Sequence, residues 1–359
     1  MDLSEFSYDL PKEFIAQSPL ADRASSKLMI LDLADALVQH AVFSAIADMF
    51  QPGDLLLLND TKVLKARLFG KAPTGGKVEV LLIKKTGKNT FEAFVRAKNV
   101  KTGKAAVFKS SGKDLKMTVG ERVSGIKYSV TFSMDGCEAS EDLDDIIYSV
   151  GVAPTPPYVK GVLSDPERYQ TVYAKNPGSI AAPTAGFHFT PALLESISKK
   201  GVAIRYVTLH VGIGTFLPVK AVVIEEHKME TEAYTIPPET AETVNESIKN
   251  GGRIWVVGTT TLRALESAYD NGLRPASGET ALFIYPGYKF KFPFDNFITN
   301  FHLPGSTLIM LVAAITGRER ILGAYEEAKK NGYRFYSFGD AMLIFRNGRN
   351  PPDAARGGE

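Results

Sequence analysis

Hydrophobic and polar residues alternate in two different ways along this chain. The run "GDLLLLND", bounded by Gly53 and Asn59, is continuously apolar, which is typical of a strand buried on both faces of an α/β sheet. After about Ser179, patterns of helical and extended type follow one another. Helices are predicted at "PALLESISKKG", "PETAETVNESIKNG", "TLRALESAYDNG" and the apolar "LIMLVAAI", and strands at "VAIRYVTLHVG" and "RIWVVG". Such alternation favours a layered α/β domain with a largely buried sheet.

The segment between these two regions has a shorter rhythm. Runs of β-branched and aromatic residues, separated by Gly, Lys, Asn and Ser, occur at "KVEVLLIKK", "TFEAFVRAKNV", "AAVFK" and "YSVTFSM". Several short strands at this spacing indicate a small barrel or sandwich. We therefore predict an α/β fold in which residues 1–62 and 151–349 form a discontinuous catalytic domain. Residues 63–150 form an inserted basic β-barrel-like domain, and residues 350–359 a flexible tail.

Charge is distributed unevenly, although the formal net charge of the chain is only +2. From Lys62 to Lys127 there are 17 basic residues and 4 acidic ones, and the acidic segment "DGCEASEDLDD" follows. One interpretation is a lysine-rich solvated surface. The other is a polyanionic partner, because clustered Lys and Arg displace counterions from phosphates when they bind nucleic acid.

Composition excludes several classes of protein. The chain is 44% hydrophobic, which supports a substantial core, and no apolar run approaches the eighteen residues of a membrane span. Its single cysteine, Cys137, excludes an internal disulfide and a cysteine-based zinc site, and the acidic N-terminus does not read as a signal peptide. We expect a cytoplasmic protein.

One polar cluster follows a predicted strand in "TLHVGIGTFLPV". His210 lies at the end of the strand, and Gly212 and Gly214 would allow a backbone to approach a ligand closely. A dinucleotide-binding fingerprint is not met, because Leu217 replaces the third glycine and no helical pattern follows. A simple turn with a hydrogen-bonded histidine explains the motif about equally well.

A second cluster is "RIWVVGTTTLRALES". We expect Thr259 to Thr261 to cap the helix that follows. Arg263 then lies in the first turn, where the helix dipole opposes a cation, so an anion should compensate it. Glu266 is the structural candidate, and a substrate carboxylate or phosphate is the functional one.

Two further clusters contain histidines. In "TNFHLPGST", Asn300 and His302 precede a helix that Ser306 or Thr307 would cap, and a loop histidine can titrate near neutrality and serve as acid or base. A histidine that is bonded to the backbone is the alternative. In "EEHKMETEAY" no two histidines have metal-ligand spacing, so we predict no metal site.

The stretch "SIAAPTAGFHFT" is a turn, because Pro183 and Gly186 interrupt regular structure, and Thr190 caps the next helix. His188 therefore lies close to a helix start, between aromatic rings that could stack on a flat ligand. Alone, a buried histidine with satisfied hydrogen bonds would be the simpler reading. Three such loop histidines, out of five in the chain, favour a shared site.

These motifs closely resemble the S-adenosylmethionine:tRNA ribosyltransferase-isomerase family of queuosine biosynthesis. The resemblance extends in order from about Phe6 to Ile344 and includes "LPKEFIAQSPLADRASSKLMIL", "GDLLLLNDTKVLKARLFG", "TGGKVEVLL" and "YRFYSFGDAMLI". One position departs from the family's His-x-Met-His-x-Glu pattern: in "HKMETE" the second histidine is Glu230, whereas His227 and Glu232 match.

The resemblance implies transfer and isomerisation of the ribosyl group of S-adenosylmethionine onto 7-aminomethyl-7-deazaguanine at the tRNA wobble position. The products would be epoxyqueuosine-tRNA, adenine and methionine. A base must remove a proton beside the sulfonium, an acid must protonate the leaving adenine, and the amine of the tRNA base must attack the rearranged sugar. The sulfonium is the electron sink, so we expect no metal and no cofactor besides the consumed S-adenosylmethionine.

The resemblance also implies site residues. We expect loops distant in sequence to converge on one water-poor pocket. The catalytic candidates are His188, His210, His302, His227 and Glu232. The substrate-binding candidates are Asn59, Asp60, Thr184, Gly186, Gly212, Gly214, Thr215, Thr259, Thr260, Arg263, Asn300, Ser306 and Asp340. The RNA-binding candidates are Lys62, Arg67, Lys84, Lys85, Lys88, Arg96 and Lys98.

The implied partner is a tRNA with a GUN-type anticodon that carries the precursor base, with no membrane, and we expect a monomer. Two other classes of function stay open. An RNA-binding module without catalysis would use the same basic strands. A methyltransferase or nucleotide-dependent oxidoreductase would need a glycine-rich loop after the first strand, and "LLLLNDTKV" has none.

Overall fold

The computed structural model describes residues 1–35, 38–110, 114–137, 142–159, 165–216 and 219–346. The predicted tail, 350–359, lies outside the described residues. Contacts divide the chain into two compact units. The first contains Met1–Lys62, Pro157–Asn176 and Ala182–Glu359, and the second contains Val63–Pro156 and Pro177–Ala181. The predicted start of the insert, residue 63, is the first residue of its longer segment. The predicted end, residue 150, lies six residues before the last residue of that segment.

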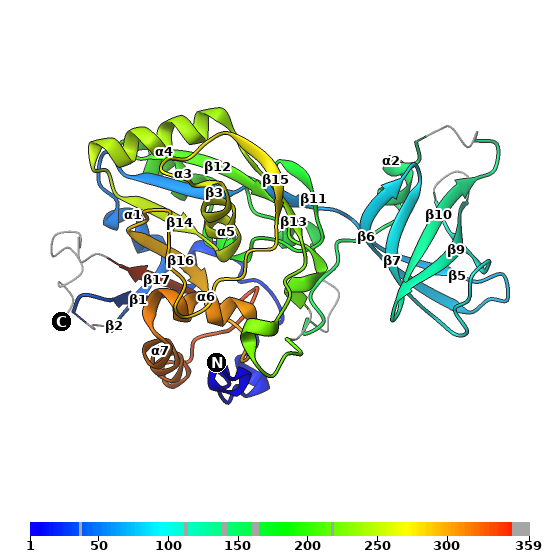
Figure 1. Ribbon diagram of the computed structural model, residues 1–359, viewed down its shortest axis with the longest axis horizontal. Helices are drawn as coiled ribbons and strands as arrows, with labels where there is room; N and C mark the ends of the chain where they lie inside the picture. The colour runs from blue at the N-terminus through cyan, green and yellow to red at the C-terminus, as the bar shows by residue number, and fades with distance from the viewer. Residues whose placement is uncertain (36–37, 111–113, 138–141, 160–164, 217–218, 347–359) are drawn as a thin grey trace. The chain divides into compact units, whose positions relative to one another are not determined.

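A nine-stranded sheet organises the first unit, in the order β15-β13-β12-β3-β14-β16-β17-β1-β2 (Figure 1). Neighbours among β12, β3, β14 and β16 run parallel, and β1 runs parallel to β17. The other pairs are antiparallel. The strands are β1 (Lys27–Asp32), β2 (Val38–Val42), β3 (Leu55–Asn59), β12 (Ala203–Leu209), β13 (Glu232–Ile236), β14 (Ile254–Val257), β15 (Ala276–Thr280), β16 (Asn296–Asn300) and β17 (Ala341–Phe345).

Helices cover this sheet. They are α1 (Ile46–Met49), α3 (Pro191–Lys199), α4 (Pro238–Asn250), α5 (Thr259–Ala268), α6 (Thr307–Thr316) and α7 (Arg318–Lys330), with short 3₁₀ segments that include η6 (Thr184–His188). The predicted helices at α3 to α6 and the strands at β3, β12 and β14 are confirmed. None of the described helices is both long and apolar enough to cross a membrane.

The main hydrophobic core explains why β3 reads as a continuous apolar run. Every residue of β3 is buried. One face, with Leu56 and Leu58, packs in a cluster with residues of α1 and α3 and with Trp255. Helix α5 also packs against β14 and β3. A strand with buried residues on both faces must be apolar throughout, so the pattern and the position in the sheet agree.

A closed six-stranded barrel forms the second unit, in the order β10-β7-β6-β5-β8-β9. Its strands are β5 (Arg67–Lys71), β6 (Lys77–Gly87), β7 (Thr90–Ala97), β8 (Ala105–Phe108), β9 (Leu115–Ser124) and β10 (Lys127–Met134), followed by α2 (Asp144–Ser149). Closure pairs every edge strand, which removes the exposed edges of an open sheet. A separate two-stranded sheet consists of β4 (Thr61–Val63) and β11 (Asn176–Ser179).

Candidate functional site

The candidate site lies at the carboxyl edge of the parallel strands. Asn59 ends β3, His210 follows β12, Gly258 follows β14 and Asn300 ends β16. Adjacent parallel strands end at the same edge of a sheet, where α/β proteins bind their ligands. Residues more than 240 positions apart in the sequence are therefore brought to one edge.

His188 reaches this edge on η6, which contacts β16. Thr190 caps α3 directly after it by accepting a hydrogen bond from the Leu193 amide at 3.1 Å, so the predicted cap is confirmed. Gly186 is required for packing, because a Cβ atom built there would lie 2.0 Å from the Tyr173 hydroxyl oxygen. Thr184, at the start of η6, is half-buried.

The imidazole of His188 is almost completely buried, with 4% of its surface exposed. Its Nδ1 lies 2.7 Å from Ser26 Oγ, and its ring packs on Phe43 with 5.0 Å between centroids. Burial lowers the pKa of His188 to about 4, although the charge of Asp340 and the side chain of Asn300 act in the opposite direction. At neutral pH the ring is therefore uncharged and can accept a proton.

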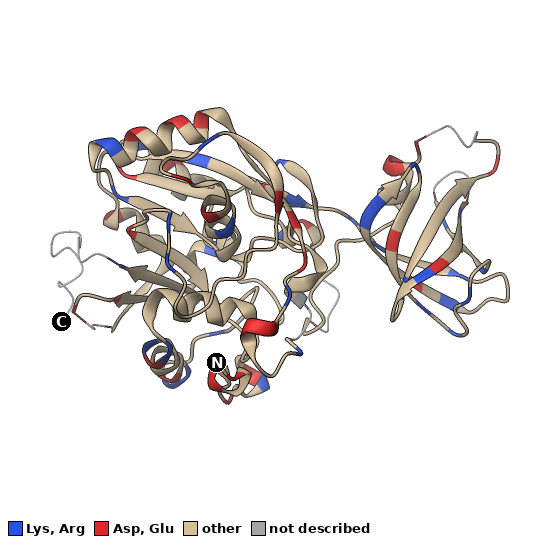
Figure 2. Cartoon of the chain, viewed as in Figure 1, with Lys and Arg blue, Asp and Glu red and all other residues tan. Residues whose placement is uncertain are grey.

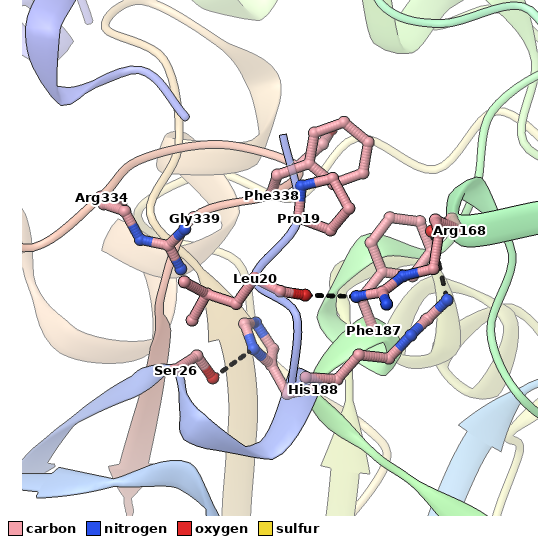
Figure 3. A pocket seen from close by; sticks show the side chains of 11 residues that line it. Pro19, Leu20, Ser26, Arg168, Phe187, His188, Arg334, Phe338 and Gly339 are labelled. Carbon is pink, nitrogen blue, oxygen red and sulfur yellow. Dashed lines mark hydrogen bonds between the residues drawn. The ribbon is translucent and has the colours of Figure 1, made fainter. Parts of the chain in front are cut away.

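A small cavity adjoins this histidine (Figure 3). It is a small, partly open hollow, and its space of about 290 Å³ includes open solvent. The lining residues are Pro19, Leu20, Arg23, Ser26, Arg168, Phe187, His188, Arg334, Ser337, Phe338 and Gly339. Within the described chain, neither Nε2 of His188 nor Asn300 Oδ1 has a partner by strict hydrogen-bond geometry, although the Asn300 side chain is close enough to the ring to favour its protonated form. A cavity with a buried, unpartnered imidazole nitrogen at its wall is the strongest ligand-binding feature of the first unit.

The three arginines of this cavity were not predicted from the sequence. Arg334 pairs with the buried carboxylate of Asp340 at 3.0 Å, and Asp340 also accepts hydrogen bonds from the amides of Lys27 and Arg334. Asp340, which was expected to be a polar residue of the pocket, thus holds the β17 end and Arg334 in place. The arginines belong to segments without a periodic pattern, and nothing in their spacing indicates a binding site.

Asp60 is the centre of a second polar cluster, at the ends of β3 and β12. Its carboxylate accepts hydrogen bonds from Thr208 Oγ1 at 2.6 Å and from Asn176 Nδ2 at 3.0 Å. His210 is held by Thr61, whose Oγ1 lies 2.8 Å from Nδ1. Burial lowers the pKa of His210, and the charge of Asp60 acts in the opposite direction. The cluster therefore combines a carboxylate with a neighbouring imidazole, which is a usual arrangement for proton transfer.

Asn59 joins this cluster to the start of α5. Its amide nitrogen donates to the Leu209 carbonyl and to Thr260 Oγ1, both at 3.0 Å. The prediction that the threonines cap α5 is wrong. Gly258 is the N-cap, and no side chain caps this helix. Thr261 instead donates to the Val257 carbonyl, and Thr259 is buried in the first turn.

Arg263 has a carboxylate partner, but it is not Glu266. Arg263 forms a buried ion pair with Glu232 and donates through Nε to the Leu282 carbonyl at 3.0 Å. Glu266 accepts hydrogen bonds from Tyr288 and from the amides at 291 and 292, so the prediction of Glu266 as the partner of Arg263 is wrong. Glu232 also accepts from the Gly212 amide at 2.8 Å. The pair therefore fixes the loop after β12.

His302 is held differently from His188. Its Nε2 lies 2.8 Å from Thr299 Oγ1, its backbone N–H donates to Tyr325 Oη at 3.0 Å, and its carbonyl accepts from Tyr8. Burial lowers its pKa to about 3, so the expected titration near neutrality is wrong. His302 is not among the lining residues of the cavity. Ser306 caps α6 as predicted, through the Ile309 amide.

Of the predicted site residues that the structure describes, His188 alone is among the lining residues of this cavity. The ring of His227 packs against Phe283 with 5.4 Å between centroids, and burial lowers its pKa. A Cβ atom at Gly214 would lie 3.2 Å from the side chain of Glu230, and Thr215 is exposed. Among the residues that the structure describes, no group of three His, Cys, Asp or Glu side chains could hold a metal ion.

The basic barrel is partly neutralised by its own carboxylates (Figure 2). Lys85 pairs with Asp142 and Asp144, and Lys116 with Asp135, so the acidic segment after β10 folds back on the barrel. Arg67 pairs with Glu79 at 3.2 Å. Over residues 63–156 and 177–181 the sequence has 16 basic and 10 acidic residues, which leaves a net charge of +6. The exposed candidates are Lys62, Lys84, Lys85, Lys88, Arg96 and Lys98, of which Lys85 is paired.

Comparison with known proteins agrees with this architecture. A relative from Caldanaerobacter subterraneus named S-adenosylmethionine:tRNA ribosyltransferase-isomerase is 50% identical over 348 residues, covering 96% of this chain and all of the relative. A relative of the same name from Acetivibrio thermocellus is also 50% identical over the same shares. The crystal structure of S-adenosylmethionine tRNA ribosyltransferase from Thermotoga maritima is 36% identical, with a TM-score of 0.54 over 95% of this chain and all of that one.

The family model described as queuosine biosynthesis protein matches residues 3–344. That range includes both units and every residue of the clusters described above. The chain therefore belongs to the queuosine biosynthesis protein family.

Proposed function

We propose that this protein transfers and isomerises the ribosyl group of S-adenosylmethionine onto 7-aminomethyl-7-deazaguanine at the tRNA wobble position. Epoxyqueuosine-tRNA, adenine and methionine are the products. The observation that carries the proposal is identity of 50% over the full length of relatives that are named for this activity. The cavity beside His188 supports it, because it offers a proton acceptor at the carboxyl edge of the sheet.

His188 is our candidate for the base that removes the proton beside the sulfonium. Its pKa of about 4 keeps the ring neutral at pH 7. The tautomer in which Nδ1 donates to Ser26 Oγ leaves the lone pair of Nε2 available. The Ser26 hydroxyl can donate or accept and is therefore compatible with that tautomer, and the Phe43 ring packs on one side of the imidazole. Removal of the proton gives an ylide, and the electron pair then expels adenine.

The polar clusters along the same edge are candidates for the later steps. Asp60 and His210 combine a carboxylate with an imidazole of lowered pKa, so the uncharged ring can take a proton from the attacking amine. Asn59 and Thr260 would contribute donors to ribose oxygens. The ion pair of Arg263 with Glu232 is best explained as support for this loop, since each charge already has its partner.

The barrel is our candidate for the tRNA-binding surface. Its net charge of +6 favours a polyanion, and Lys84, Lys88, Arg96 and Lys98 are exposed. Phe69 on β5 is 61% exposed, and the strand register places it beside Glu79, which in turn lies opposite Arg96. An exposed aromatic ring on a basic surface is a usual platform on which an unpaired base stacks.

Finer points of the proposal rest on the family resemblance. We propose that the substrate tRNAs have a GUN-type anticodon and that the enzyme works as a monomer. We also propose that S-adenosylmethionine is consumed as a substrate with no other cofactor, and that the reaction takes place in the cytoplasm.

The deciding experiment mixes pure protein, S-adenosylmethionine and tRNA that carries the precursor base, and measures free adenine by chromatography. We expect adenine and methionine in equal amounts. No adenine from protein that still binds the tRNA would favour an RNA-binding module, and S-adenosylhomocysteine would show methyl transfer instead. His188→Ala should lower kcat with little effect on tRNA affinity. His40→Ala is the matched control, because His40 also bonds a hydroxyl through Nδ1, at 2.8 Å from Tyr333, and lies outside the cavity.

A further inference from the structure

The cavity beside His188 has an excess of positive charge, and the reaction steps proposed above assign no role to it. Three of its lining residues are arginines and none is acidic. Asp340 neutralises Arg334. Within the described chain, Arg23 and Arg168 form hydrogen bonds only to backbone carbonyls: Arg23 to residues 168 and 170, and Arg168 to residues 20 and 21. These two guanidiniums therefore have no carboxylate partner there.

Their charges act on each other. Burial lowers the pKa of Arg23, and the positive charge of Arg168 lowers it further, while the charge of Asp165 acts in the opposite direction. Like charges held together at a half-buried site destabilise one another unless an anion is bound between them. The arrangement is built for an anion.

Donors for such an anion are available. A guanidinium has five N–H groups, and each of these arginines uses two of them in the contacts above. Nε of Arg168 is buried without a partner. The Arg23 guanidinium is also positioned over the ring of Phe187, 5.4 Å from its centroid, and Phe187 stacks on Phe338. These contacts fix the plane of the fork, which favours recognition of a planar carboxylate.

We propose that Arg23 and Arg168 form the subsite for the methionyl carboxylate of S-adenosylmethionine. This inference rests on the proposed function, which makes S-adenosylmethionine the substrate. The carboxylate is the anionic group of that molecule and is only a few bonds from the carbon that loses its proton, so a carboxylate site and His188 belong in one small cavity. The cavity is small, because its space of about 290 Å³ includes open solvent, so it suits one end of the ligand and not the whole molecule.

Decarboxylated S-adenosylmethionine provides the test, because it lacks this carboxylate and keeps the sulfonium and adenosyl groups. We expect the wild-type protein to bind S-adenosylmethionine about 10- to 100-fold more tightly than the decarboxylated analogue, as hydrogen bonds to a charged group suggest. In Arg23→Ala and Arg168→Ala, S-adenosylmethionine should lose most of this advantage, while affinity for the analogue changes little. Arg23→Lys keeps the charge without the fork and should have an intermediate effect.

Arg205→Ala is the matched control, because Arg205 is also half-buried and bonds a backbone carbonyl and the hydroxyl of Thr243, away from the cavity. It should preserve the wild-type preference, and thermal denaturation shows whether each variant is folded. If the cavity variants keep the full preference for S-adenosylmethionine, the proposal is wrong. Loss of tRNA affinity with the preference intact would assign the arginines to an RNA phosphate instead. Failure of the wild-type protein to release adenine would contradict the proposed function and not the subsite alone.

Discussion

The two buried histidines make a strong prediction about stability and pH. Burial lowers the pKa of His188 to about 4 and that of His302 to about 3, from an ordinary value of 6.5. Below pH 6.5 the unfolded chain takes up a proton at each position that the folded protein does not bind. Stability is therefore complete above pH 6.5 and falls as the pH decreases toward 4 and 3.

The size of the effect follows from these values. One pH unit corresponds to about 1.4 kcal/mol for each group that is protonated only in the unfolded chain. Between pH 7 and pH 5, each histidine should lower the free energy of unfolding by about 2 kcal/mol, and both by about 4 kcal/mol. For a folded domain this is a large share of the total stability.

Urea-induced unfolding at pH 7 and pH 5 measures this loss. Trp255 is the single tryptophan and is completely buried in the first unit, so its fluorescence reports the unfolding of that unit. In His302→Gln, the loss between the two pH values should be about 2 kcal/mol smaller than in the wild-type protein, whatever the variant costs at pH 7. His40→Gln, at an exposed histidine, should keep the wild-type loss. An unchanged loss in both His302→Gln and His188→Gln would refute the argument that burial holds these rings neutral.

Three further predictions concern contacts outside this titration. Phe69→Ala should weaken the binding of a fluorescent anticodon stem-loop by about 1–3 kcal/mol if a base stacks on the ring, whereas Phe91→Leu, inside the barrel, should act only through stability. Asp54→Asn breaks a buried pair with Arg253 and should lower the free energy of unfolding by about 3–5 kcal/mol, against at most about 1 kcal/mol for the exposed Asp48→Asn, as measured by circular dichroism in urea. Gly186→Ala should lower the melting temperature, and adding Tyr173→Phe should restore part of it, because the new Cβ would meet the Tyr173 hydroxyl oxygen first.

The fold was predictable where one physical constraint controls the sequence. The predicted layered α/β domain with a β-barrel is confirmed, because strands buried on both faces must be apolar, as β3 is. Two barrel strands, β5 and β9, were missed. β5 is short and contains Gly70, where a side chain would collide with Val107 and Phe108, and β9 ends in polar, exposed residues. In both strands the residues that point into the barrel are mostly apolar, but the polar residues between them interrupt the hydrophobic pattern.

The charge pattern shows what a linear count omits. The sequence suggested a basic segment followed by a separate acidic one. In three dimensions Asp135 and Asp144 return to lysines of the barrel, so much of the contrast is local neutralisation. The exposed residues that keep their charge, and not the length of the basic run, define the surface available to RNA.

Residues of the site could be predicted when they follow strands, because topology then brings them together without any knowledge of side-chain contacts. Asn59, His210 and Asn300 are of this kind. The partner of Arg263 could not be found in this way, because Glu232 comes from an antiparallel strand, 31 residues away, and the helix-based rule pointed to Glu266. Rules based on helical spacing identify partners within the same helix. They fail where a residue of a neighbouring strand, here Glu232, is the partner instead.

Arg23 and Arg168 are the sharpest case, because each is bound to the backbone of the other's segment. Arg23 donates to the carbonyl of residue 168, and Arg168 donates to carbonyls at 20 and 21. Two stretches nearly 150 residues apart are thus joined by the groups that would hold the substrate carboxylate. Binding of that carboxylate should then order both segments around His188 and couple recognition of the substrate to the position of its base. These two arginines would both join the segments and bind the substrate. They form no sequence motif, because neither segment alone has a pattern that requires an arginine.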